Sequence, residues 1–279
     1  MHVHDHAHAA QGTLLNWLPL ALIVLITLAY LAAANAQRYK AAGWSGWRSV
    51  FFTLGSLLLA VAVAPPLMAW AHHDLVGHMA LHLLIGMLAP LAWVLAAPIT
   101  LLLSTLPQAG GRRVAALLQS RFVRFVSHPV SALILNIGGM YVLYLTPLYS
   151  ASLDNQALHY WIHVHFLVAG YLFCWAILAE PDVSPHRLSL RFRLGVLFAS
   201  IATHSLLGKL MYGYAWPRGT GHSLEEVQAA AQLMYYGGDL AEVLLAVVLL
   251  TLWLRRPVER REGLFKSAER DISRVRVNI

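Results

Sequence analysis

The chain has 279 residues, of which 58% are hydrophobic and only 12% are charged. A soluble domain carries about 25% charged residues, so this composition excludes an ordinary soluble protein and indicates an integral membrane protein. The single cysteine, Cys174, excludes an intramolecular disulfide and any metal site built on paired cysteines. The net charge of +7 would fit a nucleic-acid-binding protein, but whether it indicates one depends on where the basic residues lie.

Apolar segments dominate the chain after a short histidine-rich start. Residues 1–12 alternate His2, His4, His6 and His8 with other side chains, and we expect an outer tail that is either disordered or a weak metal-capturing tract. A membrane domain follows over residues 13–254, and a basic cytoplasmic tail over 255–279. Each apolar segment has about the 20 residues that a membrane helix requires, which predicts an all-α, seven-transmembrane-helix bundle. The seven predicted spans are Leu14–Ala34, Val50–Trp70, Leu75–Ala97, Val130–Tyr149, Ala157–Ala179, Leu194–Tyr214 and Ala230–Leu254, with a possible kink at Pro90.

The basic residues predict how this bundle is oriented. The segments after the first, third and fifth spans and the C-terminal tail together hold 18 of the 20 Lys and Arg, and only Lys209 and Arg218 fall on the other side. The positive-inside rule therefore predicts an outside N-terminus and a cytoplasmic C-terminus. This asymmetry explains the positive charge without nucleic acid. Residues 112–126 mix arginines with leucines and phenylalanines, as a helix at the membrane surface does.

The histidines gather on the opposite side from the basic residues. Thirteen of the 15 lie outside or in the outer half of a span, whereas His128 and His186 are cytoplasmic. Imidazole and thioether groups are ligands for copper and for haem iron. His78 and His82 share a helix face, and a rise of about 1.5 Å per residue places His82, His163 and His204 at similar depths. The predicted metal ligands are His78, His82, His159, His163 and His204, with Met79 as a soft donor and His72 and His73 at the interface.

A polar stripe along the last span supplies candidate supporting groups. Gln228, Gln232, Tyr235, Asp239 and Glu242 are spaced by three or four residues and therefore share one helical face. A carboxylate within a span costs about 2.5–3.5 kcal/mol and normally faces a partner in the bundle. We expect Asp239 to orient a ligating imidazole or to pair with Lys209, with Glu242 nearby. For His128, His186 and His222 we expect structural hydrogen bonds instead of metal ligation.

Two segments resemble the seven-helix CtaG family of assembly factors for caa-type cytochrome c oxidases. The first is GHMALHLLIGMLAPL at residues 77–91, which is similar to the family pattern H-M-x-x-H-L-L-L-x-M-x-x-P, and the second is LHYWIHVHF at 158–166. The last span departs from the pattern, with QLMYYGGD at 232–239 where members often have an Asp-Gln pair and a Met-Trp pair. The resemblance implies a multi-pass protein of the bacterial inner membrane that helps a haem–copper oxidase mature, through copper supply.

The resemblance further implies that the metal is Cu(I) and that the partners are haem–copper oxidase subunits or copper chaperones, with the protein itself in the lipid bilayer. Two other classes of function stay open at this point, a transport protein and a haem protein. A membrane copper transporter would use the same donors, and a proton pathway would run through the ionisable groups of the last two spans. A bis-His haem or electron-transfer protein would hold haem between His82 and His163. No nucleophile–base pair is visible, so we expect a protein that is not an enzyme.

Overall fold

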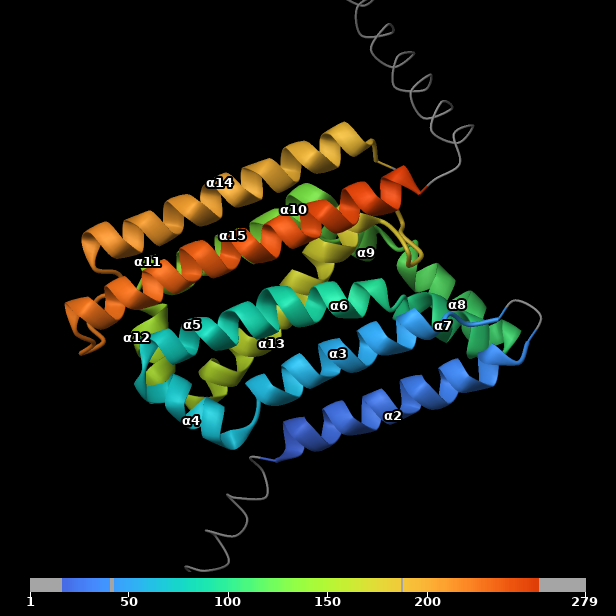
Figure 1. Cartoon of the computed structure of the whole chain (residues 1–279), viewed down its shortest axis with the longest axis horizontal. Helices are drawn as coiled ribbons and strands as arrows, with labels where there is room; N and C mark the ends of the chain where they lie inside the picture. The colour runs from blue at the N-terminus through green and yellow to red at the C-terminus, as the bar shows by residue number, and fades with distance from the viewer. Residues whose placement is uncertain (1–16, 41–42, 187, 256–279) are drawn as a thin grey trace, which may run out of the picture.

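The computed structural model describes residues 17–40, 43–186 and 188–255, and its regular structure within these ranges is helical (Figure 1). Five segments are long and apolar enough to cross a membrane, and up to seven are if each of two bent helix pairs counts as one span. The prediction of an all-α polytopic protein is therefore confirmed. The five are α2 (Leu18–Arg38), α5, η1 and α6 together (Leu75–Leu95), α13 (Gln156–Leu178), α14 (Leu190–Tyr214) and α15 (Leu224–Leu254).

Two of the predicted spans are bent instead of straight. Helices α3 (Gly46–Ala62) and α4 (Pro65–His73) meet at 54°. The segment Pro129–Leu145 meets α12 (Leu148–Asp154) at 75°. In both cases the residue before a proline is extended, as steric clash with the proline ring demands, and the chain starts a new helix in a new direction. Segment Pro129–Leu145 comprises α10 (Pro129–Leu133), η2 (Ile134–Gly138) and α11 (Gly139–Leu145).

The third span widens at the place where a proline kink was predicted. Pro90 has no N–H to donate to the carbonyl of Gly86, and the helix adopts a π-helical turn, η1 (Leu84–Leu88), between α5 (Leu75–Leu83) and α6 (Ala89–Leu95). The Gly86 carbonyl lies against α13, where a Cβ added at Gly170 would stand 1.9 Å from its oxygen. Glycine at position 170 is thus what lets α13 approach η1.

One end of the bundle, which we call the basic end, holds α7 (Pro98–Thr105), α8 (Gln108–Leu118) and α9 (Arg121–Val126) (Figure 1). The surface helix predicted over residues 112–126 is therefore two helices, with Ser120 capping the second. Asp182 closes this end, because its buried carboxylate accepts from Ile99 N at 2.9 Å and Thr100 N at 2.7 Å. These two amides belong to the first turn of α7, which lacks internal partners for them.

The other end, which we call the histidine end, gathers α4, α12 and the starts of α5, α13 and α15 (Figure 1). Two carboxylates hold the start of α5. Asp74 caps it by accepting from Gly77 N at 2.8 Å, and Glu226 from α15 accepts from Leu75 N at 2.7 Å. Helix α5 is therefore fixed both to its own cap and to the start of α15.

Candidate functional site

Three of the predicted ligands line one small cavity. His78 and His82 come from α5, His163 comes from α13, and Ile85, Ile162 and Phe166 complete a cavity of about 10 Å³. That volume is close to the smallest that holds one water molecule, so it admits a single small species. The His78 and His163 ring centroids are 6.0 Å apart. The expected shared face of His78 and His82 is present, since both side chains reach this cavity.

The hydrogen bonds of the three imidazoles leave nitrogen atoms available in the interior. His163 Nδ1 lies 2.9 Å from the carbonyl oxygen of His159, which only accepts, so Nδ1 carries the proton and Nε2 keeps its lone pair. His78 Nδ1 and His82 Nε2 are buried and have no hydrogen-bond partner among the described residues. A buried polar atom without a partner costs about 1–3 kcal/mol, which marks this as a place where a ligand supplies the missing contact.

Aromatic rings surround these histidines. Tyr149 from α12 packs 4.9 Å from the His78 ring, centroid to centroid, and Phe166 packs 4.8 Å from His82. Tyr144 stands 6.1 Å from His78, and its buried hydroxyl has no partner in the described part of the chain. The sequence analysis missed both tyrosines, although their place at the outer end of the fourth predicted span was a usable signal.

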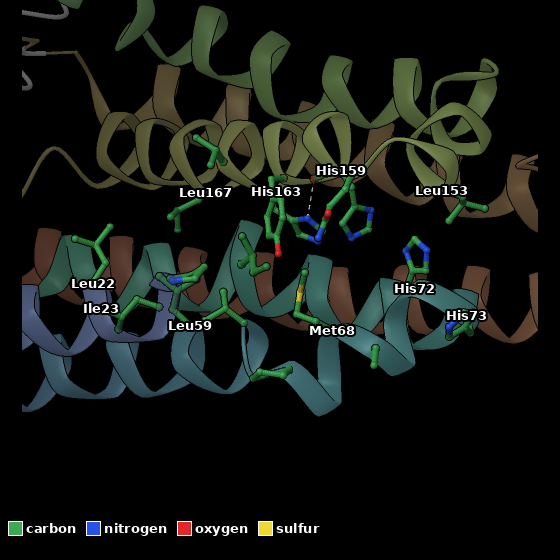
Figure 2. Close-up of a pocket in the computed structure, with 18 of the residues that line it drawn as sticks. Leu22, Ile23, Leu59, Met68, His72, His73, Leu153, His159, His163 and Leu167 are labelled. Atoms are coloured by element: carbon green, nitrogen blue, oxygen red, sulfur yellow. Dashed lines mark hydrogen bonds between the residues drawn. The ribbon is translucent and has the colours of Figure 1, made fainter. Parts of the chain in front are cut away.

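A larger open cleft of about 660 Å³ adjoins the cavity. It lies between α13 on one side and α2, α3 and α4 on the other, and its rim carries His72, His73 and His159 (Figure 2). His163 and Ile85 line both the cleft and the cavity and so form the wall between them. The predicted ligands His72, His73 and His159 therefore lie in the cleft, beside the cavity instead of within it.

The structure places His204 in a different group of polar side chains. Its ring is fully buried between α14 and α15, where Nδ1 lies 3.6 Å from Glu242 Oε2, and a Cβ added at Gly238 would stand 1.8 Å from the ring. Ser200 donates to the other carboxylate oxygen, Glu242 Oε1, at 2.5 Å. His204 lines neither the cavity nor the cleft. The predicted shared site of His82, His163 and His204 required this ring to point toward α5 and α13, whereas it points toward Glu242 on α15.

The supporting residues also differ from the expected arrangement. Glu242, not Asp239, is the carboxylate beside His204, whereas Asp239 Oδ1 accepts from Ser205 Oγ at 2.9 Å. Lys209 Nζ lies 5.6 Å from the centroid of Tyr235. Met79 is fully buried in an apolar cluster with Leu75 and Met211 and does not line the cavity.

The other histidines make hydrogen bonds that tie segments together. His222 Nδ1 lies 2.7 Å from Glu226, His186 Nε2 donates to Arg124 O at 2.7 Å, and His128 caps α10 by accepting from Val130 N at 3.4 Å. Burial is the main cause that lowers the pKa of His128, and the nearby His186 lowers it further. The His128 ring therefore stays neutral more readily, and its Nδ1 can accept a hydrogen bond. His165 Nε2 donates to Leu135 O at 3.1 Å, at the π-helical turn η2. The histidine tail of residues 1–12 lies outside the described residues.

Within residues 17–40, 43–186 and 188–255, no three His, Cys, Asp or Glu side chains stand together as a complete ligand set for one ion. Three imidazoles, those of His78, His82 and His163, line the cavity instead, and the ring centroids of His78 and His163 are 6.0 Å apart. Such an arrangement suits an ion that accepts few ligands, or one that draws the third ring inward on binding.

Comparison with known proteins agrees with the resemblance read from the sequence. An uncharacterized protein of Mycobacterium bovis is 34% identical over 192 residues, and one of Mycobacterium leprae is 32% identical over 195 residues. These alignments cover 66% and 67% of this chain but only 29% of each relative, so the chain spans under a third of their length. No solved structure gives a significant match. The family described as "Cytochrome c oxidase caa3 assembly factor" matches residues 28–256, from within α2 to the end of α15, and the chain therefore belongs to this Caa3_CtaG family.

Proposed function

We propose that this assembly factor binds one Cu(I) ion in the cavity between His78, His82 and His163 and supplies it to a haem–copper oxidase during assembly. The observation that carries the proposal is the cavity itself. It is the size of one small species and three imidazoles line it, and the buried rings of His78 and His82 each have a nitrogen that meets no hydrogen-bond partner in the described part of the chain.

The distance between the His78 and His163 rings suits the binding of one ion between them. A metal–nitrogen bond of about 2.0 Å plus about 1.1 Å from nitrogen to ring centre puts each centroid about 3 Å from the metal. Two imidazoles on nearly opposite sides of an ion then stand about 6 Å apart. The His78 and His163 centroids are 6.0 Å apart, and His82 supplies a third donor after a side-chain rotation.

The chemistry of the donors suits a metal that must be released. Neutral imidazoles bind Cu(I) without the closed thiolate cage that would retain it, and Cys174 lies elsewhere in the apolar core. His163 has the backbone partner that metal-ligating histidines commonly have, since its Nδ1 donates to His159 O. The cavity volume of about 10 Å³ favours an ion over a haem.

The proposed orientation makes this site accessible from outside the cell. Arg112, Arg113, Arg121 and Arg124 lie on α8 and α9 at the basic end, which the positive-inside rule assigns to the cytoplasm. With each bent pair counted as one span, the seven crossings of this proposal have their two ends on opposite sides, so a cytoplasmic basic end implies that α2 starts outside and α15 ends inside. The histidine end then faces the compartment in which an oxidase acquires its outer copper.

The direct test is Cu(I) loading of the detergent-purified protein, with metal analysis and competition titration. We expect one copper per chain, and we expect His78→Ala, His82→Ala and His163→Ala each to lower copper affinity about 10–100-fold. His165→Asn is the matched control, because His165 bonds to a backbone carbonyl outside the cavity. Affinities that are equal in all four variants and in the wild type would refute the site. In cells, deletion of the protein should lower oxidase activity at limiting copper, and added copper should restore part of it.

A further inference from the structure

A row of potential metal donors leads from the surface to the wall of the cavity. His73 is exposed, its ring centroid lies 5.2 Å from that of His72, and His72 lies 5.6 Å from His159. His159 in turn lies 4.5 Å from His163, the residue shared by cleft and cavity. Neighbouring ring centroids in this row are therefore 4.5–5.6 Å apart from His73 to His163.

A methionine that the sequence analysis did not single out faces the same cleft. Met68 on α4 lies opposite His159 and His163 of α13, and its thioether points into the space between them (Figure 2). The other half of the cleft is apolar and is walled by Leu22, Leu59 and Leu167 (Figure 2). Metal donors therefore occupy only the part of the cleft nearest the histidine end.

We propose that this cleft is the loading path of the protein, in which Cu(I) passes from His72, with Met68 as a second donor, through His159 to His163 and then into the cavity. The proposal rests on the proposed function, because it assumes that the cavity is the final copper site. It assigns His72, His159 and Met68 to transfer instead of storage.

The chemistry of each step is ligand exchange without oxidation. One copper–nitrogen or copper–sulfur bond forms while another breaks, and the ion remains Cu(I) throughout. A bare cation in an apolar interior is costly, so transfer requires that the next donor be within reach before the previous one is lost. Ring separations of 4.5–5.6 Å meet that condition from His72 to His163. Among the described residues, the leucines of the apolar half of the cleft, Leu22, Leu59 and Leu167, offer no donor atom to a metal ion.

The two volumes assign different roles to the two spaces. A cleft of about 660 Å³ accommodates the copper-bearing side chains of a donor molecule, whereas a cavity of about 10 Å³ accommodates only the ion. Copper therefore separates from its donor in the cleft. The inferred donor is one that presents Cu(I) through exposed, exchangeable ligands.

The test compares loading rate with equilibrium affinity. Cu(I) is presented as its coloured bicinchoninate complex, and loss of colour is followed by stopped flow. We expect His72→Ala and Met68→Leu each to load about tenfold more slowly, the lower end of what loss of a metal contact costs. Ala69→Phe, which narrows the cleft without removing a donor, should also slow loading. All three should bind one copper at equilibrium with wild-type affinity, and the control His165→Asn should load at the wild-type rate.

Wild-type loading rates in all three variants would overturn the loading path while leaving the copper site intact. Loss of equilibrium affinity in His72→Ala, as large as in His82→Ala, would also overturn it, because His72 would then belong to the storage site. A wild-type protein that binds no copper at equilibrium is a different result, which refutes the proposed function and this inference with it.

Discussion

Substitution of Gly170 by alanine tests whether the contact between α13 and η1 sets the geometry of the cavity. The added Cβ would stand 1.9 Å from the Gly86 oxygen, whereas real Cβ contacts are essentially never under 3.0 Å, so the two backbones must separate by at least the difference of 1.1 Å. Neither atom belongs to a flexible side chain. The clash therefore cannot be relieved by a change of rotamer, and α13 must move as a body or tilt.

The displacement reaches the proposed site because His163 lies seven residues before Gly170, on the same face and about 10 Å along α13. Metal–ligand distances tolerate deviations of only about 0.2 Å, so a shift of this size in one of two facing imidazoles weakens binding. We expect Gly170→Ala to lower copper affinity at least about tenfold. Overpacking of this kind costs about 1–3 kcal/mol of stability.

The assay is copper competition together with thermal unfolding in detergent, and Gly195→Ala is the matched control. Gly195 lies within α14 and has nothing within 4 Å of an added Cβ. Its substitution should leave copper binding unchanged and raise stability by up to about 1 kcal/mol, the usual preference for alanine over glycine in a helix. If Gly170→Ala behaves like Gly195→Ala in both measurements, the tight contact does not fix the site.

Two further predictions concern the basic end. Asp182→Ala should lower the unfolding temperature, because it removes the acceptor of Ile99 N and Thr100 N at a cost of roughly 1–3 kcal/mol for each unsatisfied amide. Asp182→Asn keeps one acceptor oxygen and should lower the unfolding temperature less. Equal unfolding temperatures of the wild type and Asp182→Ala would contradict the capping role. Because burial lowers the pKa of His128, the unfolded chain takes up the proton before the folded chain does, so stability should decrease as the pH falls from 7 through the ordinary histidine pKa of about 6.5. His128→Asn keeps an N-cap acceptor without this titration, and thermal unfolding across that pH range should show a flatter slope; an unchanged slope would assign the pH dependence to another group.

The sequence predicted the positions of the membrane segments well because span length and apolarity are local properties. Predicted span Ala157–Ala179 corresponds to α13 (Gln156–Leu178), and predicted span Leu75–Ala97 to the segment Leu75–Leu95. It did not predict the two bends, although Pro65 and Pro147 stand at them. Proline was treated as a kink within a span, whereas here the extended residue before it starts a helix at a new angle.

The direction in which each side chain points around its helix could not be predicted from the sequence. His82 and His204 were expected at one level, but His82 faces the cavity and His204 faces Glu242 on α15. Asp239 and Glu242 share a stripe, and nothing in their spacing decides which one meets His204. Met68 was missed because it was taken as an ordinary apolar residue of the second span, whereas the bend after α3 turns its thioether into the cleft.

The anchoring of α5 has a consequence for how quickly a ligand leaves the protein. Asp74 and Glu226 hold the first turn of the helix that carries His78 and His82, and these two contacts do not depend on the cavity, so we expect the helix to keep its position when an ion binds or leaves. A scaffold that does not relax after release has little reorganisation energy to supply at the next binding event. The barrier to exchange is then set by bond breaking at the imidazoles and by rotation of the His82 side chain, without movement of the helix, which suits a protein that must refill and empty repeatedly.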